Sequence, residues 1–179
     1  MINFNHIKAG NNPPNDVNVV VEIPKGSNIK YEIDREMGIL IVDRKLSTSM
    51  FYPGNYGFIP QTLAGDGDAA DVLVLGDESI LPTAVINTRP IGILITEDEK
   101  GEDSKLIAVP SSKVDQTLSE LKDIKDVSPN LRNVLEHFFL HHKELEEGKF
   151  VKIVGWKSRT DAFEMISQSI TKYHDKINN

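Results

Sequence analysis

Short runs of apolar residues, separated by glycine, proline and asparagine, dominate the chain up to about residue 110. Alternating or β-branched runs of this length are typical of strands, and the turn-forming residues end each run. We predict strands at Val17–Ile23, Ile29–Ile33, Ile39–Val42, Asp71–Leu75, Ala84–Asn87, Ile91–Ile95 and Leu106–Val109. Residues 47–67 contain so many glycines and prolines that no long regular element is expected there. Many short strands joined by turns indicate a small closed β-barrel of the OB-like type.

The apolar period changes to that of a helix in the C-terminal part of the chain. Ser128 and Pro129 are typical of an N-cap and a first helical position, and Gly148 ends the apolar pattern that follows. That pattern consists of Leu131, Val134, Leu135, Phe138, His142 and Leu145. A strand is predicted at Phe150–Gly155, and a second helix from about Asp161. We therefore expect one α+β domain over residues 1–179, with helices packed against the barrel.

Composition and charge narrow the class of protein. The 179 residues include no cysteine, which excludes disulfides, thiolate zinc sites and thiol nucleophiles. The net charge of −7 opposes binding to nucleic acid, and no apolar run is long enough to span a bilayer. The N-terminal segment has no apolar core typical of a secretory signal. We expect a soluble, cytoplasmic protein without nucleic-acid or membrane partners.

Three carboxylates fall within six residues between the predicted strands of the first half. They are Asp66, Asp68 and Asp71, with glycine on both sides of Asp66. Hard oxygen ligands on a tight loop suit magnesium or calcium, although a solvated acidic turn is an equally simple interpretation. An EF-hand fits poorly, because Ala70 would stand at a ligand position.

A second acidic cluster extends from Glu97 to Lys105, between two predicted strands. A solvated loop is the ordinary interpretation of such a run. The flanking strands and Gly101, however, would hold Asp98, Glu99 and Asp103 in place. Two carboxylate clusters on loops of one small domain can together hold several cations, a recurrent arrangement in phosphoryl chemistry.

Basic and phenolic side chains accompany these clusters. The cations and the phenols among them could donate hydrogen bonds to phosphate oxygens, and the carboxylates lie nearby. The residues are Lys30, Glu32, Arg44, Tyr52 and Tyr56, with Glu22 on the preceding strand. Strand-face ion pairs and core aromatics explain each of them individually. Lys30 and Glu32, two residues apart on a strand, are expected to share one face.

The ordered motifs of this chain resemble those of bacterial family I soluble inorganic pyrophosphatases. Residues 66–74, Asp-Gly-Asp-Ala-Ala-Asp-Val-Leu-Val, are similar to the family signature D-G-D-P-x-D-V-x-V, with Ala69 in place of proline. Further similar segments are 19–24, 29–32, 43–44, 51–53, 55–57, 101–105, 148–152 and 155–156. The resemblance extends over nearly the whole chain.

The resemblance implies Mg²⁺-dependent hydrolysis of pyrophosphate to two phosphates, with several Mg²⁺ per subunit and Mn²⁺ or Zn²⁺ as possible substitutes. It implies metal ligands at Glu22, Asp66, Asp71, Asp98 and Asp103, with Asp68 as general base. It implies phosphate binding by Lys30, Arg44, Tyr56, Lys105 and Lys143. Glu32 and Glu99 would orient waters and Tyr52 would support the site by hydrogen bonds. It also implies a homohexamer.

One position departs from the family pattern. The family has His-Tyr-Lys where this chain has His141, His142 and Lys143, so His142 replaces a phosphate-binding hydroxyl. We expect His142 to bind substrate, either by donating one hydrogen bond or, when protonated, by adding a charge. His137 and His141 are spaced as in a zinc helix, but the glutamate after the first histidine is missing. The resemblance instead implies that these two histidines lie at a subunit interface.

Two other classes of protein remain as alternatives. A non-catalytic OB-type module would bind single-stranded nucleic acid through a basic groove and stacking aromatics. A calcium-binding structural protein would hold divalent metal without turning over phosphate. Phosphate release from pyrophosphate separates both from an enzyme.

Overall fold

The computed structural model of the chain describes residues 4–178. The strands are β1 (Val17–Ile23), β2 (Ile29–Asp34), β3 (Ile39–Lys45), β4 (Asn55–Phe58), β5 (Asp71–Val74), β6 (Val85–Asp98), β7 (Gly101–Glu102), β8 (Lys105–Pro110) and β9 (Val151–Lys157). The helices are α1 (Pro129–His141) and α2 (Arg159–Asn178), with short 3-10 helices η1 (Phe4–His6) and η2 (Ile124–Asp126).

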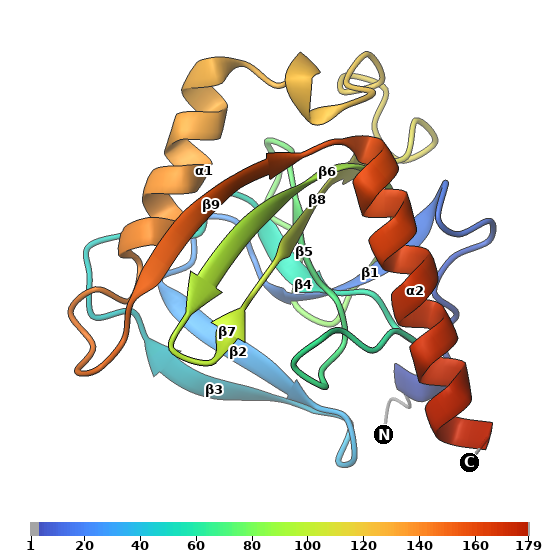
Figure 1. The fold of residues 1–179 in the computed structure, drawn as a ribbon, viewed down its shortest axis with the longest axis horizontal. Helices are drawn as coiled ribbons and strands as arrows, with labels where there is room; N and C mark the ends of the chain where they lie inside the picture. Colours follow the sequence, from blue (N-terminus) through green and yellow to red (C-terminus); the bar gives the residue numbers. More distant parts are fainter. Residues whose placement is uncertain (1–3, 179) are drawn as a thin grey trace.

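Five strands close into a ring (Figure 1). β1 pairs with β4, β4 with β5, β5 with β8, β8 with β6, and β6 pairs back with β1. The β5–β8 pair is parallel and the other four pairs are antiparallel. Each of these five strands therefore pairs with two neighbours in the ring. The predicted α+β fold with a small closed barrel is confirmed.

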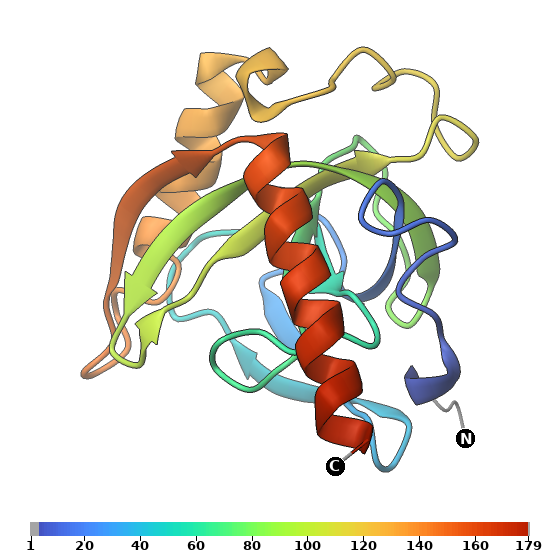
Figure 2. The same ribbon diagram turned by 45° about the vertical axis from the view of Figure 1, so that its right-hand side comes forward.

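The two helices cover opposite sides of the same strands. Figure 2 shows α2 lying across the sheet, while α1 lies beside β9. Side chains of β5 alternate between the two packing clusters: Val72 joins the cluster that contains Ile166 of α2, and Leu73 joins the cluster that contains Leu135 of α1. Within the described residues, neither helix has the length and apolar character needed to cross a membrane.

The hairpin β2–β3 forms a separate two-stranded sheet beside the barrel (Figure 1). Ile33 is buried against Phe58 and Val20, so the hairpin is fixed to the barrel wall. Lys30, Glu32 and Arg44 of the hairpin line the cavity described below.

Two predicted strands are one long strand in the structure. The sequence predicts a break at Pro90 between 84–87 and 91–95, but β6 continues through this position. A register shift at Pro90–Gly92 absorbs the proline, which has no N–H to donate to the ladder. A side chain at residue 92 would meet Ile124 and the carbonyl of Lys157 at less than 3 Å, so glycine permits the close approach.

The first helix ends earlier than predicted. Ser128 caps α1 by accepting from the N–H of Leu131 at 3.2 Å, as the sequence indicates, but the helix stops at His141 and not near Gly148. Turns follow, with Glu144 N–H donating to the carbonyl of His141. This change of direction brings Lys143 toward the acidic loop at the end of β6.

A short strand occurs in the segment for which no long element was expected. β4 spans four buried residues within this glycine-rich stretch. Its Gly57 lies against the backbone of β1, where a Cβ would collide with the carbonyl of Val20. The glycines that obscure the strand in the sequence are thus required by its packing.

Candidate active site

All the candidate residues line one cavity of about 910 Å³. They come from β1, the β2–β3 hairpin, the segment from Tyr52 to Asp71, the β6–β8 connection and the end of α1. The residues are Glu22, Lys30, Glu32, Arg44, Tyr52, Tyr56, Asp66, Asp68, Asp71, Asp98, Glu99, Asp103, Lys105, His142 and Lys143. The fold therefore assembles groups that are up to about 120 residues apart in the sequence.

The first acidic cluster forms a turn at the rim of this cavity. Gly67 has a φ of +91°, and the Asp68 N–H donates to Asp66 Oδ1 at 3.0 Å. Thr62, which is buried, accepts from the N–H of Ala70 at 2.9 Å and fixes the base of the turn. Asp66 and Asp68 are thus exposed carboxylates on a well-anchored loop.

Lys105 lies between two carboxylates at the centre of the site. Its Nζ is 2.5 Å from Asp71 Oδ2 and 2.5 Å from Asp103 Oδ1. Burial alone would lower the pKa of Lys105, but the two carboxylates outweigh it and raise the pKa. The ammonium group is therefore a permanent cation between the two aspartates.

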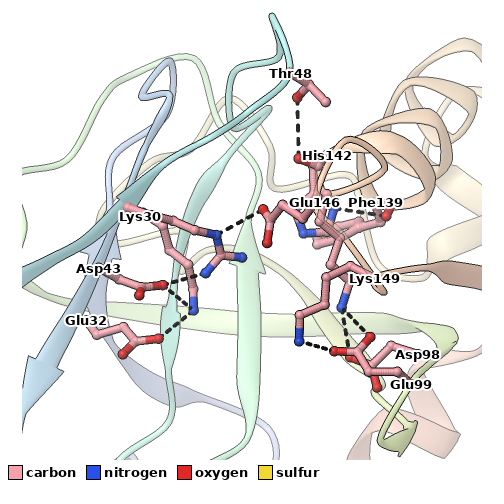
Figure 3. Close-up of polar contacts among 12 residues, drawn as sticks. Lys30, Glu32, Asp43, Thr48, Asp98, Glu99, Phe139, His142, Glu146 and Lys149 are labelled. Atoms are coloured by element: carbon pink, nitrogen blue, oxygen red, sulfur yellow. Dashed lines mark hydrogen bonds and ion pairs between the residues drawn. The ribbon is translucent and has the colours of Figure 1, made fainter.

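Two lysines form ion pairs with Asp98 and Glu99 of the second acidic cluster (Figure 3). Lys143 Nζ is 2.8 Å from Asp98 Oδ2, and both side chains are largely buried. Lys149 forms an ion pair with Glu99. Lys149 also lines the cavity and was not predicted, because it lies in an ordinary charged stretch with no recognisable spacing.

A network of charged groups crosses from the hairpin to the turns after α1 (Figure 3). Lys30 Nζ contacts Glu32 Oε1 at 2.5 Å and Asp43 Oδ2 at 3.2 Å. Arg44 contacts Asp43 at 2.5 Å and Glu146 Oε1 at 3.0 Å. The expected shared face of Lys30 and Glu32 is confirmed, and Asp43 and Glu146 are partners that sequence reasoning did not identify.

The phenols and Glu22 form the buried floor of the cavity. Burial, followed by the negative charge of Asp71, raises the pKa of Tyr56 well above its usual value. Burial also raises the pKa of Tyr52, so both phenols stay protonated. Burial raises the pKa of Glu22 to about 7, although its carboxylate accepts from the N–H of Ile33 at 2.9 Å.

His142 is fixed by hydrogen bonding within its own helix. Its Nδ1 lies 2.9 Å from the carbonyl oxygen of Phe139, and its ring stacks on Phe138. Burial, together with the charges of Lys143 and Lys105, lowers the pKa of His142 to about 4. Of the two forms that the sequence leaves open, desolvation and the neighbouring cations therefore favour the neutral imidazole near neutral pH.

The histidine pair on α1 lies outside this cavity. The rings of His137 and His141 have centroids 4.6 Å apart, and His141 Nδ1 lies 2.6 Å from Glu144. Neither residue lines the cavity.

The donor set of the cavity fits a hard divalent cation. Aspartate and glutamate oxygens from two loops are the ligands that Mg²⁺ prefers, and the chain has no cysteine to favour a softer metal. Among the described residues, 4–178, no three His, Asp or Glu side chains lie close enough to one another to bind the same metal ion. Lys105 Nζ contacts Asp71 Oδ2 and Asp103 Oδ1, so a cation that used these same two oxygens would compete with the ammonium.

Comparison with known proteins shows the family to which the chain belongs. The family model described as inorganic pyrophosphatase matches residues 19–174. The chain is 54% identical over 163 residues to an inorganic pyrophosphatase of Saccharolobus solfataricus, covering 91% of this chain and 95% of the relative. It is 51% identical over 170 residues to that of Aquifex pyrophilus, covering 95% and 96%. A crystal structure of inorganic pyrophosphatase from Thermus thermophilus superposes with a TM-score of 0.93 at 43% identity, covering 97% of this chain and 99% of the other.

Proposed function

Because the chain belongs to the inorganic pyrophosphatase family, we propose that this cavity hydrolyses pyrophosphate to two phosphates. The observation that most supports this proposal is the arrangement of charge within it. Carboxylates from two loops lie beside Lys105, Lys143 and Arg44 in one cavity. Such a mixed site can hold cations and a polyanion together, although the chain carries a net charge of −7.

Family membership implies a divalent cation, and we assign it as Mg²⁺. Asp66, Asp71 and Asp103 would hold one ion and Asp98 a further one with Asp103, while Glu22 contributes from the floor of the cavity. When bound, the cation neutralises anionic oxygens and lowers the pKa of the water that it holds. Mn²⁺ and Zn²⁺ have the same charge and accept oxygen ligands, so they are substitutes to test.

Asp68 is the proposed general base. Its carboxylate is exposed at the cavity rim, while the backbone around it is fixed by the hydrogen bond to Asp66. A carboxylate in this position accepts a proton from an attacking water within hydrogen-bond reach. Glu32 and Glu99, which line the same cavity, would orient further waters.

The cationic side chains would hold the two phosphoryl groups. Lys30 and Arg44 come from the β2–β3 hairpin, Lys105 from the start of β8 and Lys143 from the turns after α1. Their fixed positive charge stabilises negative charge on the transferring and leaving groups. Tyr56 would donate from its protonated phenol, and Tyr52 would support the arrangement from the core.

The proposal extends to location and assembly. The absence of cysteine supports a reducing cytoplasm. The family resemblance implies a homohexamer, and exposed apolar side chains on α1 and at β9, namely Val134, Leu140, Phe150 and Val154, support a subunit interface. Light scattering of the purified protein should give the mass of six chains, and the mass of one chain would contradict the assembly.

Phosphate release from pyrophosphate tests the function directly. Purified protein should release phosphate with Mg²⁺ and lose this activity in excess chelator, because the carboxylates would then repel the substrate. Binding of Mg²⁺ without phosphate release would support a non-catalytic metal-binding protein. Unchanged release in chelator would contradict the metal-dependent chemistry.

A further inference from the structure

Backbone hydrogen bonds and ring contacts fix the position of His142 in the cavity. His142 is the C-cap residue of α1, and its backbone N–H donates to the carbonyl of Phe138 at 2.8 Å. Its backbone carbonyl accepts a hydrogen bond from Thr48 Oγ1 at 3.3 Å (Figure 3). Its ring stacks on Phe138 at 5.1 Å and meets Phe139 edge to face at 6.0 Å. The ring therefore has one orientation relative to the cavity that it lines.

The hydrogen bond to Phe139 determines where the ring carries its proton. A carbonyl oxygen accepts and cannot donate, so the Nδ1 that lies 2.9 Å away must bear the hydrogen. A neutral imidazole has one N–H, which leaves Nε2 with a free lone pair. Burial and the nearby charges of Lys143, Lys105 and Arg44 lower the pKa of His142 to about 4 and keep the ring neutral.

The hydrogen-bond acceptor Nε2 of His142 differs from the other side chains that we expect to bind phosphate in this cavity. Lys30, Arg44 and Lys143 can only donate, and they suit any oxyanion. The lone pair of Nε2 opposes an unprotonated oxygen but attracts a P–OH group. Complete hydrolysis of P₂O₇⁴⁻ by one water gives two HPO₄²⁻, so each product carries a P–OH that the ionised substrate lacks.

We propose that His142 Nε2 accepts a hydrogen bond from the P–OH of a protonated phosphate, and so makes the cavity select hydrogen phosphate over unprotonated tetrahedral anions. The proposal rests on the proposed function, because it assumes that phosphoryl groups bind in this cavity. His142 is then a specificity-determining residue that recognises the product, and not a substitute donor.

Calorimetric binding of inorganic phosphate and of sulfate, at about pH 8 and with the same Mg²⁺ concentration, tests the proposal. Both anions are then tetrahedral dianions, but only phosphate carries a proton. The wild-type protein should prefer phosphate by about 10-fold or more, the cost of an unpaired acceptor facing an anion. His142→Phe should reduce this preference to roughly 3-fold or less through weaker phosphate binding, and should not weaken sulfate binding.

His174→Phe is the matched control, because His174 is exposed on α2 and away from the cavity. This variant should keep the wild-type preference. An equal preference in wild type and His142→Phe, or no preference in the wild-type protein, would overturn the proposal. If His142→Phe fails to fold, His142→Gln, which adds a donor, should strengthen sulfate binding relative to phosphate.

The tautomer provides a second measurement that needs no variant. The ¹⁵N spectrum of the imidazoles should show His142 protonated at Nδ1 and not at Nε2 near neutral pH, and the opposite assignment would overturn the proposal. Pyrophosphate hydrolysis assayed on the same preparation separates the two ideas. Absence of anion selectivity in the wild-type protein with normal hydrolysis contradicts only the role of His142, whereas selectivity without hydrolysis contradicts only the proposed function.

Discussion

At the scale of single residues, the site is organised by lysines that lie between acidic groups. Lys105 contacts both Asp71 and Asp103, and its side chain is 9% exposed. The sequence indicates the carboxylates and the lysine as separate ligands. It does not show that the same two carboxylates hold the ammonium, because that contact depends on the parallel pairing of β5 with β8.

Replacing Lys105 tests this competition. Lys105→Gln should lower the free energy of unfolding in chelator by roughly 2–4 kcal/mol, because it leaves two neighbouring carboxylates without their cation. Added Mg²⁺ should stabilise the variant more than the wild-type protein, since no ammonium competes for Asp71 and Asp103. Thermal unfolding with and without Mg²⁺ measures both effects. Lys113→Gln, on an exposed loop, is the control, and equal stabilisation of variant and wild type by Mg²⁺ would contradict the competition.

Glu22 gives a dependence of stability on pH. Its pKa is about 7 in the folded protein against 4.5 as the reference, so the folded state holds the proton more tightly in this interval. Stability from this group is therefore present at low pH and is lost as the pH rises toward about 7. In chelator, Glu22→Gln should stabilise the protein by roughly 1–3 kcal/mol above that pH and have little effect near pH 4.

Thermal unfolding across this pH range checks the prediction for Glu22. The exposed Glu120→Gln serves as the control. A stabilisation by Glu22→Gln that is the same at both ends of the range would show that ionisation of Glu22 is not its cause.

At the scale of elements, local sequence patterns predict that a helix or strand exists more reliably than they predict where it begins and ends. The apolar runs indicate most of the barrel strands, and Ser128 with Pro129 marks the beginning of α1. The continuity of β6 and the end of α1 at His141 depend on partners distant in the sequence, and local patterns do not show them. The same explanation holds for Lys149, which reaches the site through Glu99.

The cap of α1 should influence stability without entering the chemistry. Ser128→Ala removes the acceptor for the N–H of Leu131 and should cost about 0.5–2 kcal/mol of unfolding free energy. Denaturant unfolding measures this cost, with the exposed Ser112→Ala as a control. Since the cap lies at the opposite end of the helix from Lys143, kcat at saturating pyrophosphate should change less than threefold, roughly. A large loss of kcat in Ser128→Ala with unchanged stability would contradict the view that the cap affects stability and not catalysis.

At the scale of the whole molecule, closure of the barrel creates the site. The order β1–β4–β5–β8–β6 places the loop before β5 beside the connection between β6 and β8. The hairpin β2–β3 and the turns after α1 complete the cavity from the other side. The resemblance in the sequence identified most of the charged and phenolic residues that line the cavity, whereas their ion pairs and the tautomer of His142 required the three-dimensional arrangement.

The measurement that tests the account most directly is kcat for pyrophosphate at saturating Mg²⁺ for wild type, Asp68→Asn and Asp77→Asn. Asp68→Asn keeps the shape of the side chain but removes the proposed base, so kcat should fall by roughly 10²–10⁴. Residual activity of this variant should rise with pH, as hydroxide becomes available without the base. Asp77→Asn, at an exposed aspartate outside the cavity, should match the wild-type protein. Normal turnover by Asp68→Asn at saturating Mg²⁺ would contradict the central claim that this cavity activates water through an aspartate base.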